Sequence, residues 1–394
     1  MNALKLKESI DSLFPCKWQG DFIDDLHDLF SRFIKIVKIS DSLSRESLSF
    51  IEELCNTIIE IIQYYYEGRR WLAFEKFTIV MNGKGESDGL FDRLGKIIIM
   101  KDDYLYRGRP KENDKVYDRL DMFHIPLDKR GLVKTQRFSC PGFPCLYLGN
   151  SIYCCWEELK RKPLESLMFS AFRARRQFSL FDLRIPDLEN YQVDKIDQTL
   201  KRVPLILACS IAVKCPDDVF KPEYIIPQFI TDTIILRNKA ILKDESIINS
   251  DNNIWGVIYS STQIHEGFTN DTKLLQNIML PIVGINSKKN YCQYLASLFD
   301  ISKPLSYDYD INQLCGLRDT TRTIGTPNAR INTKERYENS IFAHIEKDLQ
   351  KSEFDELEHL YIPEGVIYLD YLGAPVDFSI YASSNCQWEI DNKN

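Results

Sequence analysis

The chain has 394 residues, of which 44% are hydrophobic, so it can bury a sizeable core and form about two or three domains. Its net charge of -7 and its lack of a large basic block argue against a protein that binds nucleic acid backbone, because phosphate neutralisation requires clustered Lys and Arg. No run approaches the roughly 18 to 20 apolar residues that span a bilayer, and no secretory signal is recognisable, so we expect a cytoplasmic protein with no membrane partner.

Three amphipathic helices are predicted in the first part of the chain. Apolar residues recur every three or four positions over residues 22–37 and again over residues 44–67, where Gly68 is placed to end the helix. A shorter helix is predicted over residues 71–77. The polar stretch 82–89 then forms a linker. Together these segments predict a small antiparallel helical domain.

Short strand-like runs follow, separated by turns. They lie at residues 97–100, 104–109, 145–148, 178–183 and 255–260. Helical patterns interrupt them at residues 152–161, at 194–214, where Pro204 predicts a kink or break, and at 224–237. Because strands and helices do not alternate regularly, an α+β domain with a mixed β-sheet core is favoured over a doubly wound parallel sheet.

The sequence after Pro281 has fewer clear patterns. Residues 337–349 predict a helix, because their apolar residues lie on one stripe. Residues 366–372 predict a strand at the edge of a sheet.

The cysteine pattern is typical of reduced thiols. Eleven cysteines occur without a CxxC pair, and Cys154 and Cys155 are adjacent, which does not suit a disulfide framework. Cys140 and Cys145 could help to bind a metal, but none of the five histidines lies at ligand spacing from another. We therefore expect no metal site.

Three arginines lie near strand-like runs and turns, where side chains can point into a cleft: Arg107, Arg109 and Arg137. Arginines that converge on one cleft would bind a pyrophosphate, whereas each alone is more typical of a solvated surface residue. Glu158 lies in a segment rich in aromatic residues and cysteine, and we expect its neighbour Glu157 to face solvent.

Several familiar catalytic sites are absent from the sequence. It contains neither a GxGxxG nor a GxxxxGK[ST] phosphate loop, and it lacks the GxSxG nucleophile elbow. His124 is the best placed histidine for acid/base chemistry, but a packed, hydrogen-bonded histidine is the favoured interpretation.

Five segments in order resemble the RES domain, a family named for an Arg, a Glu and a Ser. They are LYRGR (105–109), DMFHIP (121–126), TQRFSCPGFPCLYLGNSIYCCWEEL (135–159), EYIIPQF (223–229) and GVIYSS (256–261). The resemblance covers roughly residues 100–285, about half of the chain.

The central family motif is an Arg, a Tyr ten residues later and a Glu eleven residues beyond. Arg137, Tyr147 and Glu158 occupy these positions. The earlier family arginine matches Arg107, and the glycine that usually precedes the central arginine is replaced by Gln136.

The family serine matches Ser261, with the adjacent Ser260 as the alternative. A further family motif lies on a helix and is matched by Glu223, Tyr224 and Gln228, which we expect to be mostly structural.

The resemblance implies a fold similar to that of the ADP-ribosyltransferase toxins and cleavage of the nicotinamide–ribose bond of NAD. Water or inorganic phosphate would be the acceptor, and no metal is implied. Arg107 and Arg137 would hold the anionic parts of NAD, and Tyr147 would pack on the nicotinamide side. Glu158 would bind the ribose hydroxyls and stabilise developing positive charge, and Ser261 would contact phosphate or the acceptor.

The resemblance also implies a toxin or defence effector that depletes NAD, with a protein antitoxin as partner. Two alternatives stay open: an ADP-ribosyltransferase that modifies a macromolecule, and a non-catalytic NAD-binding interaction module. We divide the chain into a helical N-terminal domain (1–90), an NAD-binding catalytic domain (91–290) and a C-terminal extension that packs on it (291–394). The N-terminal helices either pack on the rest of the chain or bind a partner, and homo-oligomerisation is also left open.

Overall fold

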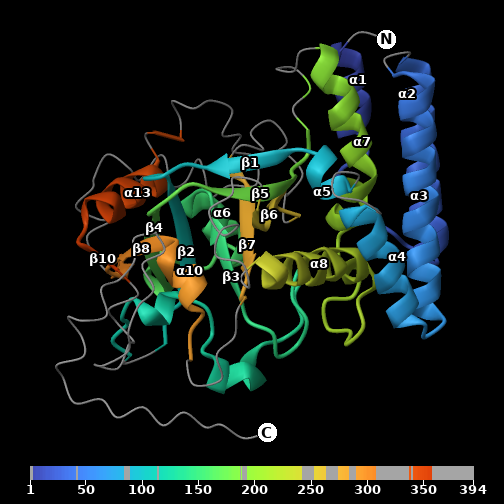
Figure 1. Ribbon diagram of the computed structural model, residues 1–394. Coiled ribbons are helices and arrows are strands. Elements are labelled where there is room, and N and C mark those ends of the chain that lie inside the picture. The colour runs from blue at the N-terminus through green and yellow to red at the C-terminus, as the bar shows by residue number, and fades with distance from the viewer. Residues whose placement is uncertain are drawn as a thin grey trace, which may run out of the picture.

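A computed structural model of the chain shows one large mixed sheet with helices around it (Figure 1). The structure describes residues 3–40, 43–83, 89–112, 115–186, 188, 193–241, 253–262, 274–283, 290–307, 337–338 and 340–356. Within these ranges, every helix is too short or too polar to cross a membrane.

The predicted helical region at the N-terminus is confirmed. Its helices are α1 (Ala3–Asp11), α2 (Phe22–Ser40), α3 (Arg45–Tyr66) and α4 (Arg70–Asn82), followed by the single turn α5 (Leu90–Arg93). The Ser44 side chain accepts a hydrogen bond from the backbone N–H of Ser47 and so caps the start of α3. Gly68 follows the end of α3 with a φ of 78°, a conformation that glycine adopts without strain.

The described residues after α5 contribute the strands of a single ten-stranded sheet. In spatial order they are β1 (Lys96–Ile99), β5 (Phe178–Leu183), β6 (Ile254–Ser260), β7 (Gln276–Pro281), β3 (Cys145–Gly149), β2 (Tyr104–Pro110), β4 (Leu167–Ala174), β8 (Phe299–Ser302) and β10 (Phe354–Glu356), while β9 (Leu305–Ser306) pairs with β4. Among the described strands, only β5 and β6 are parallel neighbours. The five strands predicted between residues 97 and 260 are present, whereas the sequence patterns did not reveal β4, β7, β8, β9 and β10.

Five further helices lie within the described residues. They are α6 (Ile152–Glu158), α7 (Val193–Ser210), α8 (Ile225–Ile241), α10 (Gln293–Ser297) and α13 (Ile341–Lys351). The helices α6, α7, α8 and α13 confirm predicted helices, although α7 continues through Pro204 as one helix, and α10 was not predicted. The predicted strand at 366–372 and much of the predicted linker at 82–89 lie outside the described residues.

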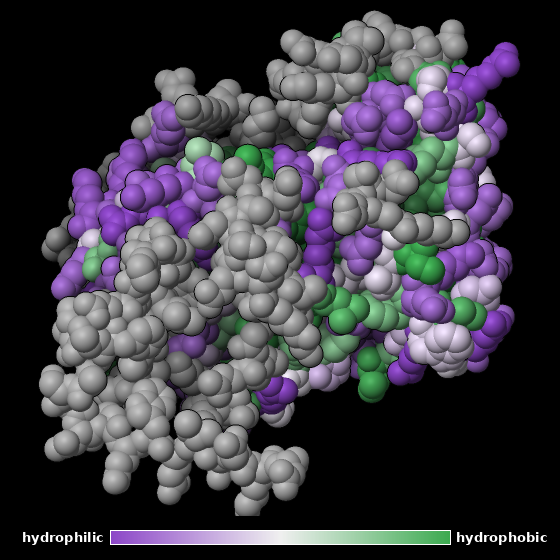
Figure 2. Space-filling view, viewed as in Figure 1, coloured by the Kyte–Doolittle hydropathy of each residue, from purple (hydrophilic) through white to green (hydrophobic). Residues whose placement is uncertain are grey.

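The N-terminal helices do not have a core of their own. Their apolar faces belong to one buried cluster with α7, α8 and the sheet residues Val257 and Met279, which are cross-strand partners. Figure 1 shows α7 running alongside α3, and hydrophilic residues predominate on the visible outer surface of these helices, with small apolar areas between them (Figure 2). The helices therefore pack on the rest of the chain, which was one of the two predictions made for them.

The shared core predicts that α2 contributes to the stability of the whole unit. Phe33 is fully buried there, so Phe33→Ala should lower the free energy of unfolding by about 3–5 kcal/mol. Denaturant titration followed by circular dichroism would measure this, and Lys35→Ala, at an exposed position of the same helix, should change it by less than about 0.5 kcal/mol. Equal stability of Phe33→Ala and the wild type would contradict the shared core.

Candidate active site

The Glu158 carboxylate receives two short hydrogen bonds. The Ser261 hydroxyl and the Asn277 side-chain amide each donate to Oε1 of Glu158 at 2.6 Å. Glu158 is the last residue of α6, Ser261 follows β6 directly, and Asn277 lies within β7. The Glu158 side chain is exposed, and no group within the described ranges donates to its Oε2. One carboxylate oxygen is therefore fixed while the other is available to a ligand.

The alternative family serine, Ser260, has a different partner. Its hydroxyl oxygen accepts a hydrogen bond from the backbone N–H of Ile185 at 3.0 Å. Because neighbouring residues of a strand point to opposite faces, only one of the two serines can reach Glu158, and it is Ser261.

The packing of α6 on the sheet fixes the direction in which Glu158 points. Ser151 caps the helix, since its hydroxyl oxygen accepts from the backbone N–H of Cys154 at 2.9 Å. A Cβ at Gly149 would lie 2.9 Å from Sγ of Cys155, so glycine is required for α6 to approach β3 this closely.

The expectation that Glu157 faces solvent was wrong. Glu157 is 4% exposed, and its Oε2 lies 2.9 Å from Nε of Arg161, whereas Glu158 is exposed. The helical repeat explains the reversal, because Glu157 follows the buried Tyr153 by one turn and shares its side of α6. The aromatic, Cys-rich sequence around these two residues did not show that Glu157 is the buried one.

Arg137 is buried beside this cluster and is 9% exposed. Its Nη1 donates to the carbonyl oxygens of Cys209 and Ile211, both at 2.9 Å, and its Nη2 donates to Oγ1 of Thr262 at 3.3 Å. Cys209 and Ile211 flank the last residue of α7, so the guanidinium neutralises carbonyls at the negative end of that helix. Thr262 follows Ser261, which brings Arg137 to the same site as Glu158.

Two tyrosines lie within electrostatic range of both charges. Burial raises the pKa of Tyr224 and that of Tyr259. The Arg137 charge lowers both pKa values, and the Glu158 charge raises both. The Arg137 guanidinium also lies 5.4 Å from the centre of the Tyr224 ring. The charged pair is therefore lined by neutral phenols.

The turn that carries Arg137 is held by backbone and amide hydrogen bonds. The backbone N–H groups of Gln136 and Ser139 each donate to the other residue's carbonyl, at 2.9 and 3.2 Å. Nε2 of Gln228 donates to the same two carbonyl oxygens, at 3.1 and 3.2 Å. Gln136 is not among the described residues with positive φ, so this turn forms without the usual family glycine. Gln228 has the structural role that was expected.

Tyr147 lies on the same sheet face as Asn277. It pairs with Met279 across β3 and β7, and Asn277 is two residues from Met279. The Tyr147 hydroxyl donates to Oγ of Ser139 at 3.1 Å, and burial raises its pKa well above the usual value. The structure thus places a neutral tyrosine between the Arg137 turn and the sheet.

The structure does not bring Arg107 to Glu158. Tyr106 pairs with Gly149 and packs among the α6 residues, whereas Leu105 packs in the core on the other side of the sheet. By strand alternation, Arg107 shares the face of Leu105. Nη1 of Arg107 is buried without a hydrogen-bond partner in the described part of the chain, and burial lowers its pKa to about 9. A role for Arg107 in anion binding stays a prediction.

His124 is a packed, hydrogen-bonded histidine, as was predicted from the sequence. It is 1% exposed, its Nδ1 lies 2.8 Å from the carbonyl oxygen of Ile125, and its Nε2 accepts from the backbone N–H of Cys292 at 2.9 Å. Burial lowers its pKa to about 4, so it is neutral at physiological pH. Arg109, the third candidate arginine, donates to the carbonyl oxygen of Asp121 nearby.

The nine cysteines within the described ranges are all free thiols. In the same ranges, no group of three or more His, Cys, Asp or Glu side chains could hold a metal ion.

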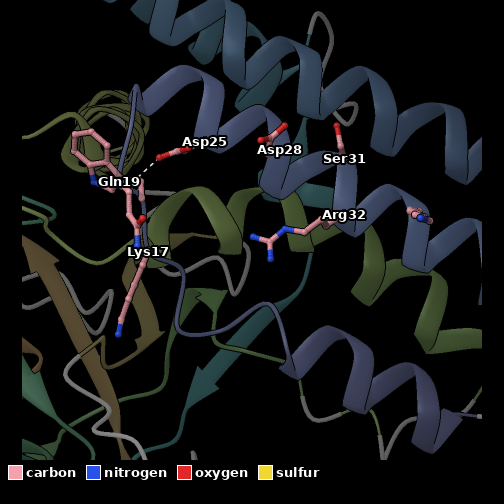
Figure 3. Close-up of a pocket in the computed structure, with 8 residues that line it drawn as sticks. Lys17, Gln19, Asp25, Asp28, Ser31 and Arg32 are labelled. Carbon is pink, nitrogen blue, oxygen red and sulfur yellow. Dashed lines mark hydrogen bonds between the residues drawn. The ribbon is translucent and has the colours of Figure 1, made fainter.

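A surface hollow of about 530 Å³ lies beside α2, and Glu158 is not among the residues that line it (Figure 3). Lys17, Asp28 and Arg32 line it and are exposed. Asp28 and Ser31 point away from Lys17, while the Asp25 carboxylate accepts a hydrogen bond from the backbone N–H of Gln19 (Figure 3). This hollow has no arrangement that would favour catalysis.

The hollow is connected to the site through Trp18. Nε1 of Trp18 donates to Oε1 of Glu223 at 2.7 Å, and the backbone N–H of Lys214 donates to the same oxygen at 2.9 Å. Glu223 is 2% exposed and precedes Tyr224, which lies beside Arg137. The N-terminal segment therefore supports the Arg137 side of the site, and Glu223 is structural, as expected.

The sequence patterns did not reveal two residues of this cluster, Asn277 and Thr262. A signal for Asn277 was available, because it directly precedes the apolar run IMLPIV at the start of a strand-like segment. In the structure its side chain is 7% exposed. Buried polar residues require partners, and so an isolated one in a strand indicates a polar site. Thr262 carries no such signal, since it lies in an ordinary turn sequence.

The chain is similar in sequence to known proteins. Residues 114–279 match the family model of the RES domain. Over 304 residues the chain is 32% identical to a Bacillus subtilis (strain 168) protein named "Putative toxin YopC", an alignment that covers 73% of this chain and 64% of that protein. No solved structure matches the chain, so the likeness to ADP-ribosyltransferases stays a prediction. Arg137, Tyr147, Glu158, Ser261 and Asn277 all fall within the matched region, and residues 114–279 of this chain are a RES domain.

Proposed function

We propose that the chain cleaves the nicotinamide–ribose bond of NAD, as a glycohydrolase or phosphorylase, and acts as a toxin that depletes NAD. The observation that carries this proposal is the Glu158 carboxylate, fixed through one oxygen by Ser261 and Asn277 and open at the other. The RES domain and the name of the relative support a toxin-like function related to NAD.

The carboxylate suits the charge that this reaction develops. As the bond to nicotinamide loosens, positive charge appears on the ribose, and a nearby carboxylate stabilises that transition state more than the ground state. The two donors on Oε1 of Glu158 hold it in place before the reaction, so little reorganisation is needed. Oε2 would accept hydrogen bonds from the ribose hydroxyls.

Arg137 would contribute its positive charge to holding the anionic part of NAD. Because its Nη1 is already bonded to two carbonyl oxygens of the α7 terminus, a bidentate grip on phosphate through both terminal nitrogens is not open to it. Tyr147 and Tyr224 offer flat neutral surfaces beside this charge. Inorganic phosphate would serve as co-substrate in the phosphorylase form of the reaction, and a protein antitoxin would be the partner.

The first test removes the charge of Glu158. We expect Glu158→Gln to slow nicotinamide release from NAD by about a hundred- to a thousandfold, because the charge aimed at the transition state is lost. Release would be followed by chromatography with and without phosphate. Glu165→Gln makes the same change at an exposed position and should retain wild-type activity.

Equal activity of Glu158→Gln and wild type would remove Glu158 from the mechanism. Transfer of labelled ADP-ribose to macromolecules would favour the transferase alternative, and NAD binding without release of nicotinamide would favour a binding module.

The second test places a like charge at the Asn277 amide. In Asn277→Asp a carboxylate would replace the amide that lies 2.6 Å from Oε1 of Glu158. The new carboxylate and Glu158 would then share a proton up to a higher pH, because ionising both would place two negative charges side by side. We expect the acid limb of kcat/KM to move up by about one pH unit or more.

The matched comparison is Ser261→Ala, which removes a donor without adding charge and should lower the rate with a smaller shift. An unchanged pH profile for Asn277→Asp would show that the ionised state of Glu158 does not control the rate.

A further inference from the structure

The helix α13 lies outside the RES match and binds the start of α6. Oε1 of Glu346 accepts a hydrogen bond from the backbone N–H of Ile152 at 2.8 Å and another from the hydroxyl of Tyr337 at 2.5 Å. Ile152 is the first residue of α6, and its N–H has no partner within the helix. Ser151 satisfies the N–H of Cys154, so α6 is capped partly by its own N-cap residue and partly by α13.

Aromatic packing joins the two helices beyond this hydrogen bond. The Phe342 ring centre lies 5.2 Å from those of both Tyr153 and Trp156. Further along α13, Nε2 of Gln350 donates to the hydroxyl of Tyr106 at 2.5 Å, on the strand beneath α6. The helix α6 is therefore held between the sheet and α13.

A helix of seven residues cannot hold its orientation alone. Helices this short are marginal in water, so packing at their sides and ends determines where they point. On the sheet side, Gly149 permits close contact with Cys155; on the other side, Phe342 and Glu346 supply the contacts. Glu158 lies at the opposite end of α6 from the bond to Glu346, so a tilt of the helix would displace its carboxylate.

The charge of Glu346 suits this position. A carboxylate at the amino end of a helix is favoured by the helix dipole and by the unpaired N–H groups there. Burial raises the pKa of Glu346, while the bonds from Tyr337 and from Ile152 lower it. Without the Glu346 carboxylate, the Ile152 N–H and the Tyr337 hydroxyl would lose the acceptor that the structure gives them.

We propose that α13 is a positioning element for Glu158, and that Glu346 is the positioning residue that sets the start of α6. This inference rests on the proposed cleavage of NAD for its effect on rate, but its effect on α6 can be measured independently. Glu346 touches no reacting group and acts only through α6.

The test compares Glu346→Ala with Glu346→Gln in the full chain. Two readouts are needed: steady-state nicotinamide release, and hydrogen–deuterium exchange of the α6 amides. Glu346→Ala should lower kcat by about ten- to a hundredfold through misplacement of Glu158, with a much smaller change in KM, and should speed exchange over residues 152–158. Glu346→Gln keeps an oxygen acceptor and should recover most of both properties. Lys347→Ala, at the adjacent exposed position, should behave as wild type.

Unchanged α6 exchange and unchanged kcat in Glu346→Ala would overturn the proposal. Equal losses in Glu346→Ala and Glu346→Gln would also overturn it, because the acceptor would then not be what matters. If wild type releases no nicotinamide, the proposed reaction fails, but α6 exchange still decides the positioning role. Should Glu346→Ala not fold, Tyr337→Phe removes only one donor, and it must speed α6 exchange for the proposal to stand.

Discussion

Two short hydrogen bonds to one oxygen of Glu158 are the constraint on which the candidate site depends. Both donors come from the β6 and β7 region, while the acceptor comes from a short helix that follows β3. The sheet order places β6, β7 and β3 side by side, so the register between these strands decides whether the three groups meet. A one-residue slip would turn Asn277 to the opposite face and leave Glu158 without its amide donor.

The sequence alone could predict much of the fold and part of the site. Alternation and helical spacing depend on local chain geometry, which is why the predicted strands and helices were confirmed wherever the structure describes them. The family resemblance placed Glu158 and Ser261 in one site, and the structure joins them by a hydrogen bond. The burial of Glu157 could not be predicted, because it depends on which side of α6 packs against the rest of the chain. The sheet face of Arg107 could not be predicted either, because it depends on how β2 pairs with its neighbouring strands. The contact of Glu346 with Ile152 joins residues 194 positions apart, and no local pattern encodes it.

Arg137 has a structural role and an electrostatic role. Its guanidinium satisfies carbonyl oxygens at the end of α7 and brings positive charge to within range of the tyrosines that also sense Glu158. A lysine could supply the charge but could not donate to two carbonyls and to Thr262 in the same fixed plane. The structural and electrostatic roles of this residue are therefore inseparable, and loss of activity in an Arg137 variant would not by itself identify a ligand contact.

The two charges of the site are supported from opposite ends of the molecule (Figure 1). On one side, Trp18 and Glu223 tie the N-terminal segment to Tyr224 and hence to Arg137. On the other, α13 holds the start of α6 and hence Glu158. Neither Trp18 nor α13 lies within the RES match at residues 114–279. Elements on both sides of the RES match therefore support the arginine and the carboxylate in this chain, and they belong to the structure of its candidate site.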